Sequence, residues 1–270
     1  CVSNTRFIPT FTGEYEKKLS FAQMATVKHS SHAYGTPRVT FGDIDGDGKT
    51  DIVVNNYETN TVSIRRNTSI PGTLTFEEEV SFPAGATPYS TVVADIDGDG
   101  KLDIIVSNTN SHTVSVFRNT SSPGSITVSS LALHYEIAGF STPFEPVFAD
   151  FNMDGRPDLA VANNSYGGGT TVSILRNLST AGTIKFGEIQ NFTTGSTPGS
   201  ISCADFDGDG MIDLATSNYF GGSISVLRNT GNQYGFINFA PKIDLNSGPQ
   251  TQVNDAGDID GDGKVDLVAV

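Results

Sequence analysis

The chain has 270 residues and a formal net charge of −14, with 30 acidic residues against 16 basic ones. A chain of this length can bury a sizeable core in one or two domains. The basic residues are scattered and no apolar run reaches the ~18 residues of a membrane span, so we expect neither nucleic-acid binding nor membrane insertion.

The first residues of the chain give two expectations. The chain begins at Cys1 and not at a methionine, so we expect a processed form or a fragment of a longer chain. A mature bacterial lipoprotein, which also begins with cysteine, is the alternative. Residues 6–13 and 19–27 (LSFAQMATV) align with the third and fourth strands of the repeat described next. The other cysteine, Cys203 in SISCAD, is predicted to be a small buried core residue.

Five short aspartate-rich loops follow along the chain, separated by 52, 55, 55 and 53 residues. We call them the aspartate loops. They are DIDGDGKTD at 43–51, DIDGDGKLD at 95–103, DFNMDGRPD at 150–158, DFDGDGMID at 205–213 and DIDGDGKVD at 258–266. A near-constant interval indicates a repeat of about 54 residues.

Each repeat unit carries four segments with the composition of β-strands. An apolar stretch precedes each aspartate loop, a β-rich run such as IVVNN follows it, and an alternating segment such as TVSIRRNTS comes next. A fourth segment such as LTFEEEVSF ends in a Gly/Thr/Pro turn. Val, Ile, Thr and Phe separated by Asn, Gly, Ser and Pro indicate strands and turns, and helical periodicity is missing.

These units predict an all-β fold, a β-propeller with four-stranded antiparallel blades that forms a single domain over residues 1–270. A calcium-binding β-roll has a period of about nine residues and does not fit. Strands at 6–13 and 19–27 would complete the last blade, whose second strand ends the chain, and close a five-blade ring. Part of a larger propeller remains the alternative.

The aspartate loops have the chemistry of a cation site. Four carboxylates in nine residues repel one another unless a cation lies between them. Oxygen ligands at positions 1, 3, 5 and 9, with a backbone carbonyl at position 7, suit calcium before magnesium. An EF-hand would need a glutamate at position 12 and flanking helices, whereas position 12 here is a strand residue such as Val54.

The loops, the small residue before each of them and the GATP turn at 85–88 resemble the FG-GAP or VCBS repeats of integrin-α-like β-propellers. The stretch FGDIDGDGKTDIVV at 41–54 is a close match, although the literal Phe-Gly pair occurs only there. The resemblance implies that each loop joins the first two strands of a blade and binds calcium on the face opposite the usual ligand surface.

The resemblance also implies the ligands of up to five structural calcium ions. They are Asp43, Asp45, Asp47, Asp51 and the Lys49 carbonyl; Asp95, Asp97, Asp99, Asp103 and the Lys101 carbonyl; Asp150, Asn152, Asp154, Asp158 and the Arg156 carbonyl; Asp205, Asp207, Asp209, Asp213 and the Met211 carbonyl; and Asp258, Asp260, Asp262, Asp266 and the Lys264 carbonyl. Because Asn152 replaces an aspartate, we expect the third site to bind calcium most weakly.

The loops on the opposite face have the composition of a recognition surface. They are rich in Asn, Ser, Gly and Tyr, which supply hydrogen bonds and flat aromatic area, although such loops are also good turn formers. The candidate ligand-binding residues are Tyr57, Tyr89, His112, Tyr166 and Tyr219. N-x-S/T patterns begin at Asn67, Asn119 and Asn177, and their position in the same turn of each unit favours a structural role over glycosylation.

No catalytic constellation recurs among the units, and the histidines lie at unrelated positions of the repeat. We therefore expect a secreted or cell-surface binding and adhesion module, not an enzyme, with a cell-surface glycan or protein as its partner. The alternatives are a protein-interaction or spacer segment of a large repeat-containing surface protein and, more remotely, a domain of a polysaccharide-degrading enzyme.

Overall fold

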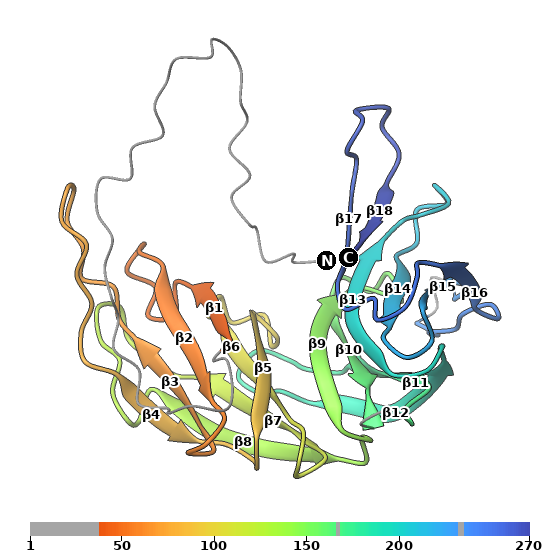
Figure 1. Ribbon diagram of the computed structural model, residues 1–270. Coiled ribbons are helices and arrows are strands. Elements are labelled where there is room, and N and C mark those ends of the chain that lie inside the picture. Colours follow the sequence, from red (N-terminus) through yellow and green to blue (C-terminus); the bar gives the residue numbers. More distant parts are fainter. Residues whose placement is uncertain (1–37, 166–167, 232–234) are drawn as a thin grey trace.

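The computed structural model describes residues 38–165, 168–231 and 235–270, and these residues fold as a series of antiparallel β-sheets (Figure 1). No helix in the described ranges is long and apolar enough to cross a membrane. The strands of the first two sheets are β1 (Val39–Gly42), β2 (Asp51–Asn56), β3 (Thr61–Arg65), β4 (Val80–Pro83), β5 (Pro88–Ala94), β6 (Asp103–Asn108), β7 (Thr113–Asn119) and β8 (Leu131–Ala138). The later strands are β9 (Pro143–Ala149), β10 (Asp158–Asn163), β11 (Thr171–Asn177), β12 (Phe186–Thr193), β13 (Pro198–Ala204), β14 (Asp213–Asn218), β15 (Ser223–Leu227), β16 (Ile243–Asn246), β17 (Asn254–Gly257) and β18 (Asp266–Ala269).

Each repeat unit forms one sheet whose strands pair in chain order. Four sheets have four strands each, from β1–β4 to β13–β16, and β17 pairs with β18 in a fifth. The prediction of four-stranded antiparallel units is therefore confirmed for these four units. Residues 6–13 and 19–27, predicted to complete the last blade, lie outside the described residues, so the five-blade ring stays a prediction.

The first strands of successive units lie side by side. Strand β1 contacts β5, β5 contacts β9, β9 contacts β13 and β13 contacts β17, and Figure 1 shows the sheets following one another in an arc around these strands. This is the radial arrangement of propeller blades. It brings the ends of the first strands, far apart in sequence, to common places in the molecule.

The hydrophobic core lies between neighbouring sheets, and one loop residue of each of the first three units joins it. The second residue of the first aspartate loop, Ile44, is 1 % exposed and packs with Val93 and Phe117 of the next sheet. The corresponding Ile96 and Phe151 are equally buried, each in a cluster with the following sheet. Burying a side chain of this size contributes about 1.5–3 kcal/mol, so the loops help to hold the sheets together.

The faces at the two ends of the arc are apolar and exposed. Ile259, the second residue of the fifth aspartate loop, is 65 % exposed, and Phe41 of β1 is 58 % exposed. Val93, which stands at the position of Phe41 in the second unit, is buried against the first sheet. Cys203 is buried in the core as predicted, and this burial raises the pKa of its thiol to about 12.

Candidate functional site

The aspartate loops lie where the repeat predicts them, between the first and second strand of each sheet. The loop after β1 spans residues 43–50, and its last aspartate, Asp51, is the first residue of β2. In the later units Asp103, Asp158, Asp213 and Asp266 likewise begin the second strand. The loops therefore gather at one end of the first strands.

The backbone of the first aspartate loop turns its carboxylates inward. The Asp43 carboxylate accepts hydrogen bonds from the N–H groups of Asp47 (3.0 Å) and Gly48 (2.9 Å), and Asp45 accepts a second bond from Asp47 N–H (3.0 Å). Gly46 and Gly48 have φ values of +71° and +87°, which only glycine adopts readily. The turn thus requires glycine at the positions with positive φ and aspartate at the positions that accept the backbone hydrogen bonds, which explains the alternation of Asp and Gly in the sequence.

The last aspartate of each of the first four loops is buried. Asp51 is 0 % exposed, and its carboxylate accepts hydrogen bonds from Ile44 N–H (2.9 Å) and Asn67 N–H (2.8 Å). Burial raises the pKa of the equivalent Asp103 to about 6 and of Asp158 to about 7, although the hydrogen bonds oppose this rise. A cation in the loop would favour the ionised form of these groups.

Four of the loops bring three carboxylates close enough to share one cation. In each cluster one oxygen per residue lies within 4.8 Å of the others. The clusters are Asp43, Asp45 and Asp51; Asp95, Asp97 and Asp99; Asp205, Asp207 and Asp213; and Asp258, Asp260 and Asp262. An all-oxygen, carboxylate-rich set fits a hard cation, so these residues could hold a metal ion.

The third loop differs from the others. Asn152 is buried, and its amide nitrogen has no hydrogen-bond partner among the described residues. Asp154 contacts two guanidinium groups, those of Arg156 (2.7 Å) and Arg176 (3.0 Å). Burial raises the pKa of the Asp154 carboxyl, but the two arginines lower it by more, so the pKa lies below its usual value. The smaller number of carboxylates agrees with the weak calcium binding predicted for this loop, which stays a prediction.

An arginine at the end of the third strand contacts the loop in each complete sheet. Arg66 donates hydrogen bonds to Asp45 and Asp47, and Arg118 does the same to Asp97 (2.7 Å) and Asp99. In the fourth sheet Arg228 lies 3.6 Å from Asp207. These arginines reduce the repulsion between the carboxylates of the loop.

The asparagine after this arginine connects neighbouring sheets. The Asn119 side-chain amide donates to Ile44 O of the preceding loop (2.7 Å) and to Leu102 O of its own unit (2.9 Å). Asn177 and Asn229 repeat this pattern, and we call these three the bridging asparagines. Asn119 and Asn177 are 0 % exposed, so neither amide is free for glycosylation in the folded chain, as the repeat position predicts.

A pocket lies at the opposite end of the first strands. Its cavity measures about 660 Å³, within the range of small-molecule sites. The lining includes Arg38 before β1, Tyr89 on β5, Phe144 and Glu145 on β9, and Ser200 on β13. Since the seven residues of β9 span roughly 23 Å, the pocket and the aspartate loops are separate sites.

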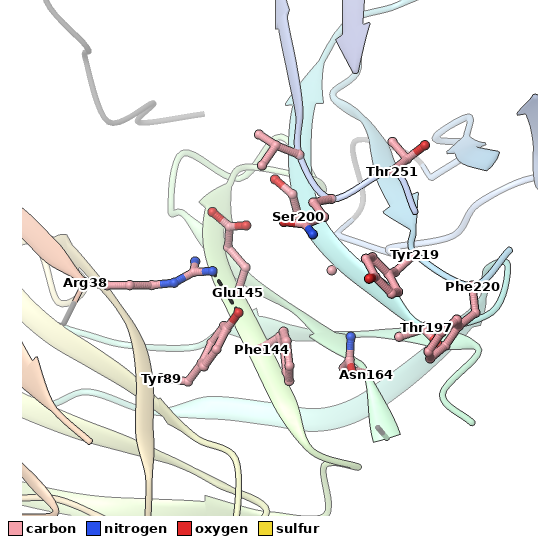
Figure 2. Close-up of a pocket in the computed structure, with 13 residues that line it drawn as sticks. Arg38, Tyr89, Phe144, Glu145, Asn164, Thr197, Ser200, Tyr219, Phe220 and Thr251 are labelled. Atoms are coloured by element: carbon pink, nitrogen blue, oxygen red, sulfur yellow. Dashed lines mark hydrogen bonds between the residues drawn. The ribbon is translucent and has the colours of Figure 1, made fainter. Parts of the chain in front are cut away.

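Two aromatic pairs face the cavity from different sides (Figure 2). The rings of Tyr89 and Phe144 have centroids 4.1 Å apart, and those of Tyr219 and Phe220 are 5.0 Å apart. Arg38 donates a hydrogen bond to the Tyr89 hydroxyl (2.8 Å), and its guanidinium carbon lies 4.3 Å from the centre of the Tyr89 ring. Flat apolar faces thus alternate with charged and polar groups around one cavity.

Hydrogen bonds from neighbouring turns fix the backbone of the pocket. Thr197, which precedes Pro198, has a φ of +63°, a strained value for a β-branched residue, and its carbonyl accepts from Tyr219 N–H (3.0 Å). Thr87 and Thr142 repeat this conformation before their own prolines. The Ser217 hydroxyl of the fourth unit donates a hydrogen bond to Gln252 O of the fifth unit (3.0 Å), so a contact between units also holds the lining strands in place.

The pocket contains two of the five residues predicted to bind a ligand, Tyr89 and Tyr219. Tyr57 does not line it, and the exposed His112 accepts a hydrogen bond at Nδ1 from Thr142 N–H (3.0 Å). Tyr166 lies outside the described residues. A ligand role for these last three stays a prediction.

The sequence prediction did not include Arg38, Phe144, Glu145, Ser200 or Phe220, which also line the pocket. A signal was present for four of them, because Arg38, Phe144, Glu145 and Ser200 each stand one or two residues after a Thr-Pro pair. Because these positions begin the first strands, the propeller arrangement gathers them near the axis.

The repeat match identifies the family. A model of the FG-GAP-like repeat matches residues 43–106, 95–161, 150–216 and 205–269, so the matches overlap along nearly all of the described chain. The protein belongs to the FG-GAP-like repeat family. A comparison with curated protein sequences finds no match.

Solved structures support the propeller-like fold. A protein from Lactobacillus plantarum is similar with a TM-score of 0.53 at 15% identity, over 86% of this chain and 63% of that one. The periplasmic gluconolactonase of Pseudomonas aeruginosa also gives 0.53, at 16% identity, over 87% of this chain and 57% of that one. The chain thus spans about three-fifths of each of these structures, and the likeness concerns the fold alone.

Proposed function

We propose that this chain is a calcium-stabilised extracellular binding module that takes a saccharide in the pocket lined by Tyr89, Phe144 and Tyr219. The observation that carries the proposal is the combination of two aromatic pairs with Arg38 and Glu145 around one cavity. Aromatic rings pack against the apolar faces of sugar rings, and the polar groups hydrogen-bond to hydroxyls. Adhesion to a cell-surface glycan is the corresponding role.

Calcium is the cofactor in this proposal, and its role is structural. The carboxylate clusters have the hard oxygen donors that calcium prefers, and extracellular modules of this kind bind it with dissociation constants near ~0.1–1 mM. Five ions would add ten positive charges to −14 and leave about −4. The ions would therefore relieve most of the repulsion within the folded chain.

Binding without turnover fits the pocket best. Glu145 is the one carboxylate that lines the cavity in the described part of the chain, whereas most glycosidases act with a pair of carboxylates across the scissile bond. A site with one acid, one guanidinium and four aromatic rings can orient a sugar by hydrogen bonds and ring contacts.

A glycan array with the calcium-loaded chain tests the proposal. We expect specific, saturable binding that falls at least tenfold in Tyr219→Ala, because this change removes one aromatic face of the pocket. Phe236→Ala is the control, since Phe236 is an exposed aromatic residue outside the pocket lining. Binding to no glycan by the folded, calcium-loaded chain would overturn the proposal and favour a protein partner.

A further inference from the structure

The charges around the pocket are unevenly placed. Figure 2 shows the Arg38 guanidinium and the Glu145 carboxylate on the same side of the cavity, with Tyr219 and Phe220 across from them. Arg38 already donates to the Tyr89 hydroxyl (2.8 Å) and lies against the Tyr89 ring. Its positive charge is therefore partly engaged before any ligand enters.

Glu145 sits in a less solvated place than Arg38. It is partly buried on β9, whereas Arg38 is exposed. Burial raises the pKa of Glu145, Arg38 opposes this rise, and the nearby Asp255 adds to it. Among the described residues that line the pocket, the one carboxylate, Glu145, is thus less exposed than the one guanidinium, Arg38.

We propose that the pocket selects neutral saccharides over acidic ones and that Glu145 is the residue that excludes uronates. This inference rests on the proposed saccharide binding and names the ligand class. A carboxylate on the ligand would meet Glu145 in a poorly solvated space, where repulsion between like charges is strong. A neutral sugar instead donates its hydroxyl hydrogens to Glu145 and accepts from Arg38, while a ring face packs on Tyr219.

The polar groups around the cavity agree with a neutral ligand. Besides the two charged residues the lining offers the amides of Asn164 and Gln252 and the hydroxyls of Thr197 and Thr251. Amides and hydroxyls both donate and accept, as the hydroxyls of a sugar do. The net charge, −14 without metal and about −4 with five calcium ions bound, adds a long-range repulsion toward acidic polysaccharides.

The test uses oligogalacturonides and their carboxyl-methylated forms, which differ in charge on the same sugar. For the calcium-loaded chain we expect the methyl esters to bind at least tenfold more tightly than the free acids in calorimetric titrations. Glu145→Gln, which keeps the shape and a hydrogen-bonding oxygen, should narrow this ratio to less than threefold. Glu188→Gln is the matched control, because Glu188 is exposed on β12 and the change in net charge is the same.

The outcomes separate the two proposals. If neither form binds and a broad glycan array is also silent, saccharide binding itself is wrong. If saccharides bind but free acids bind as tightly as esters, or Glu145→Gln leaves the ratio unchanged, only the selectivity is overturned. If Glu145→Gln does not fold, the salt dependence of the unmodified chain decides. Added salt should then raise the affinity for the free acids and leave that for the esters unchanged, and no rise would overturn the inference.

Discussion

At the scale of single residues, the bridging asparagines explain why an Arg-Asn pair recurs at the same turn of the repeat units. Each side-chain amide donates to two backbone carbonyls, one in the aspartate loop of the preceding unit and one in its own unit. The arginine before each of them contacts an aspartate of the loop in its own unit. One dipeptide thus balances the loop charge and connects two blades.

The first prediction concerns Asn177. We expect Asn177→Ala to lower the free energy of unfolding by about 2–4 kcal/mol, because Ile96 O and Pro157 O lose their donor in a buried place. Asn67→Ala is the control, since the Asn67 amide is partly exposed and donates to Thr50 O of its own unit. Urea unfolding measures both. Equal losses in the two variants would contradict a bridging role.

The contacts of the bridging asparagines with the preceding unit could not be predicted from the sequence. The spacing of the aspartates predicts the four-stranded units and the position of every loop, because both depend on residues close together in the chain. Asn119 and its partner Ile44 are 75 residues apart, so their contact depends on the propeller arrangement and not on local pattern. Arg38 and Glu145 are likewise gathered only by the fold, although the Thr-Pro turns before them recur in the sequence.

At the scale of elements, the aspartate loop acts as a joint between sheets as well as a candidate metal site. The carboxylates of the first loop turn inward around Gly46 and Gly48, and the second residue of each of the first three loops packs against the next sheet. The alternation of side chains along the loop therefore separates a polar side from an apolar one. A cation that orders the loop would also fix the apolar residue in its neighbour.

The second prediction compares one loop position in two units. Ile96→Ala should cost about 2–5 kcal/mol of unfolding free energy, since Ile96 is 1 % exposed and its loss leaves a cavity between sheets. Ile259→Ala should change stability by less than about 0.5 kcal/mol, because Ile259 is 65 % exposed. The comparison is made by urea unfolding of the full chain. A large cost at Ile259 would mean that another surface covers it in solution.

At the scale of the whole molecule, the first strands connect two sites of different chemistry. The aspartate loops collect carboxylates at one end, and the pocket collects aromatic rings at the other. The propeller arrangement explains both, because it repeats the same strand ends around one axis. Calcium would then stabilise the scaffold on which the pocket is built without touching the ligand.

The measurement that tests this account most directly is urea unfolding of the full chain, stripped of metal by chelation, during titration with calcium and, separately, with magnesium. Each filled site should add about 2.7 kcal/mol at a calcium concentration 100 times its dissociation constant. We therefore predict that the unfolding midpoint rises steadily through the millimolar range of calcium and hardly moves with magnesium. A midpoint that stays constant at all calcium concentrations would contradict the account.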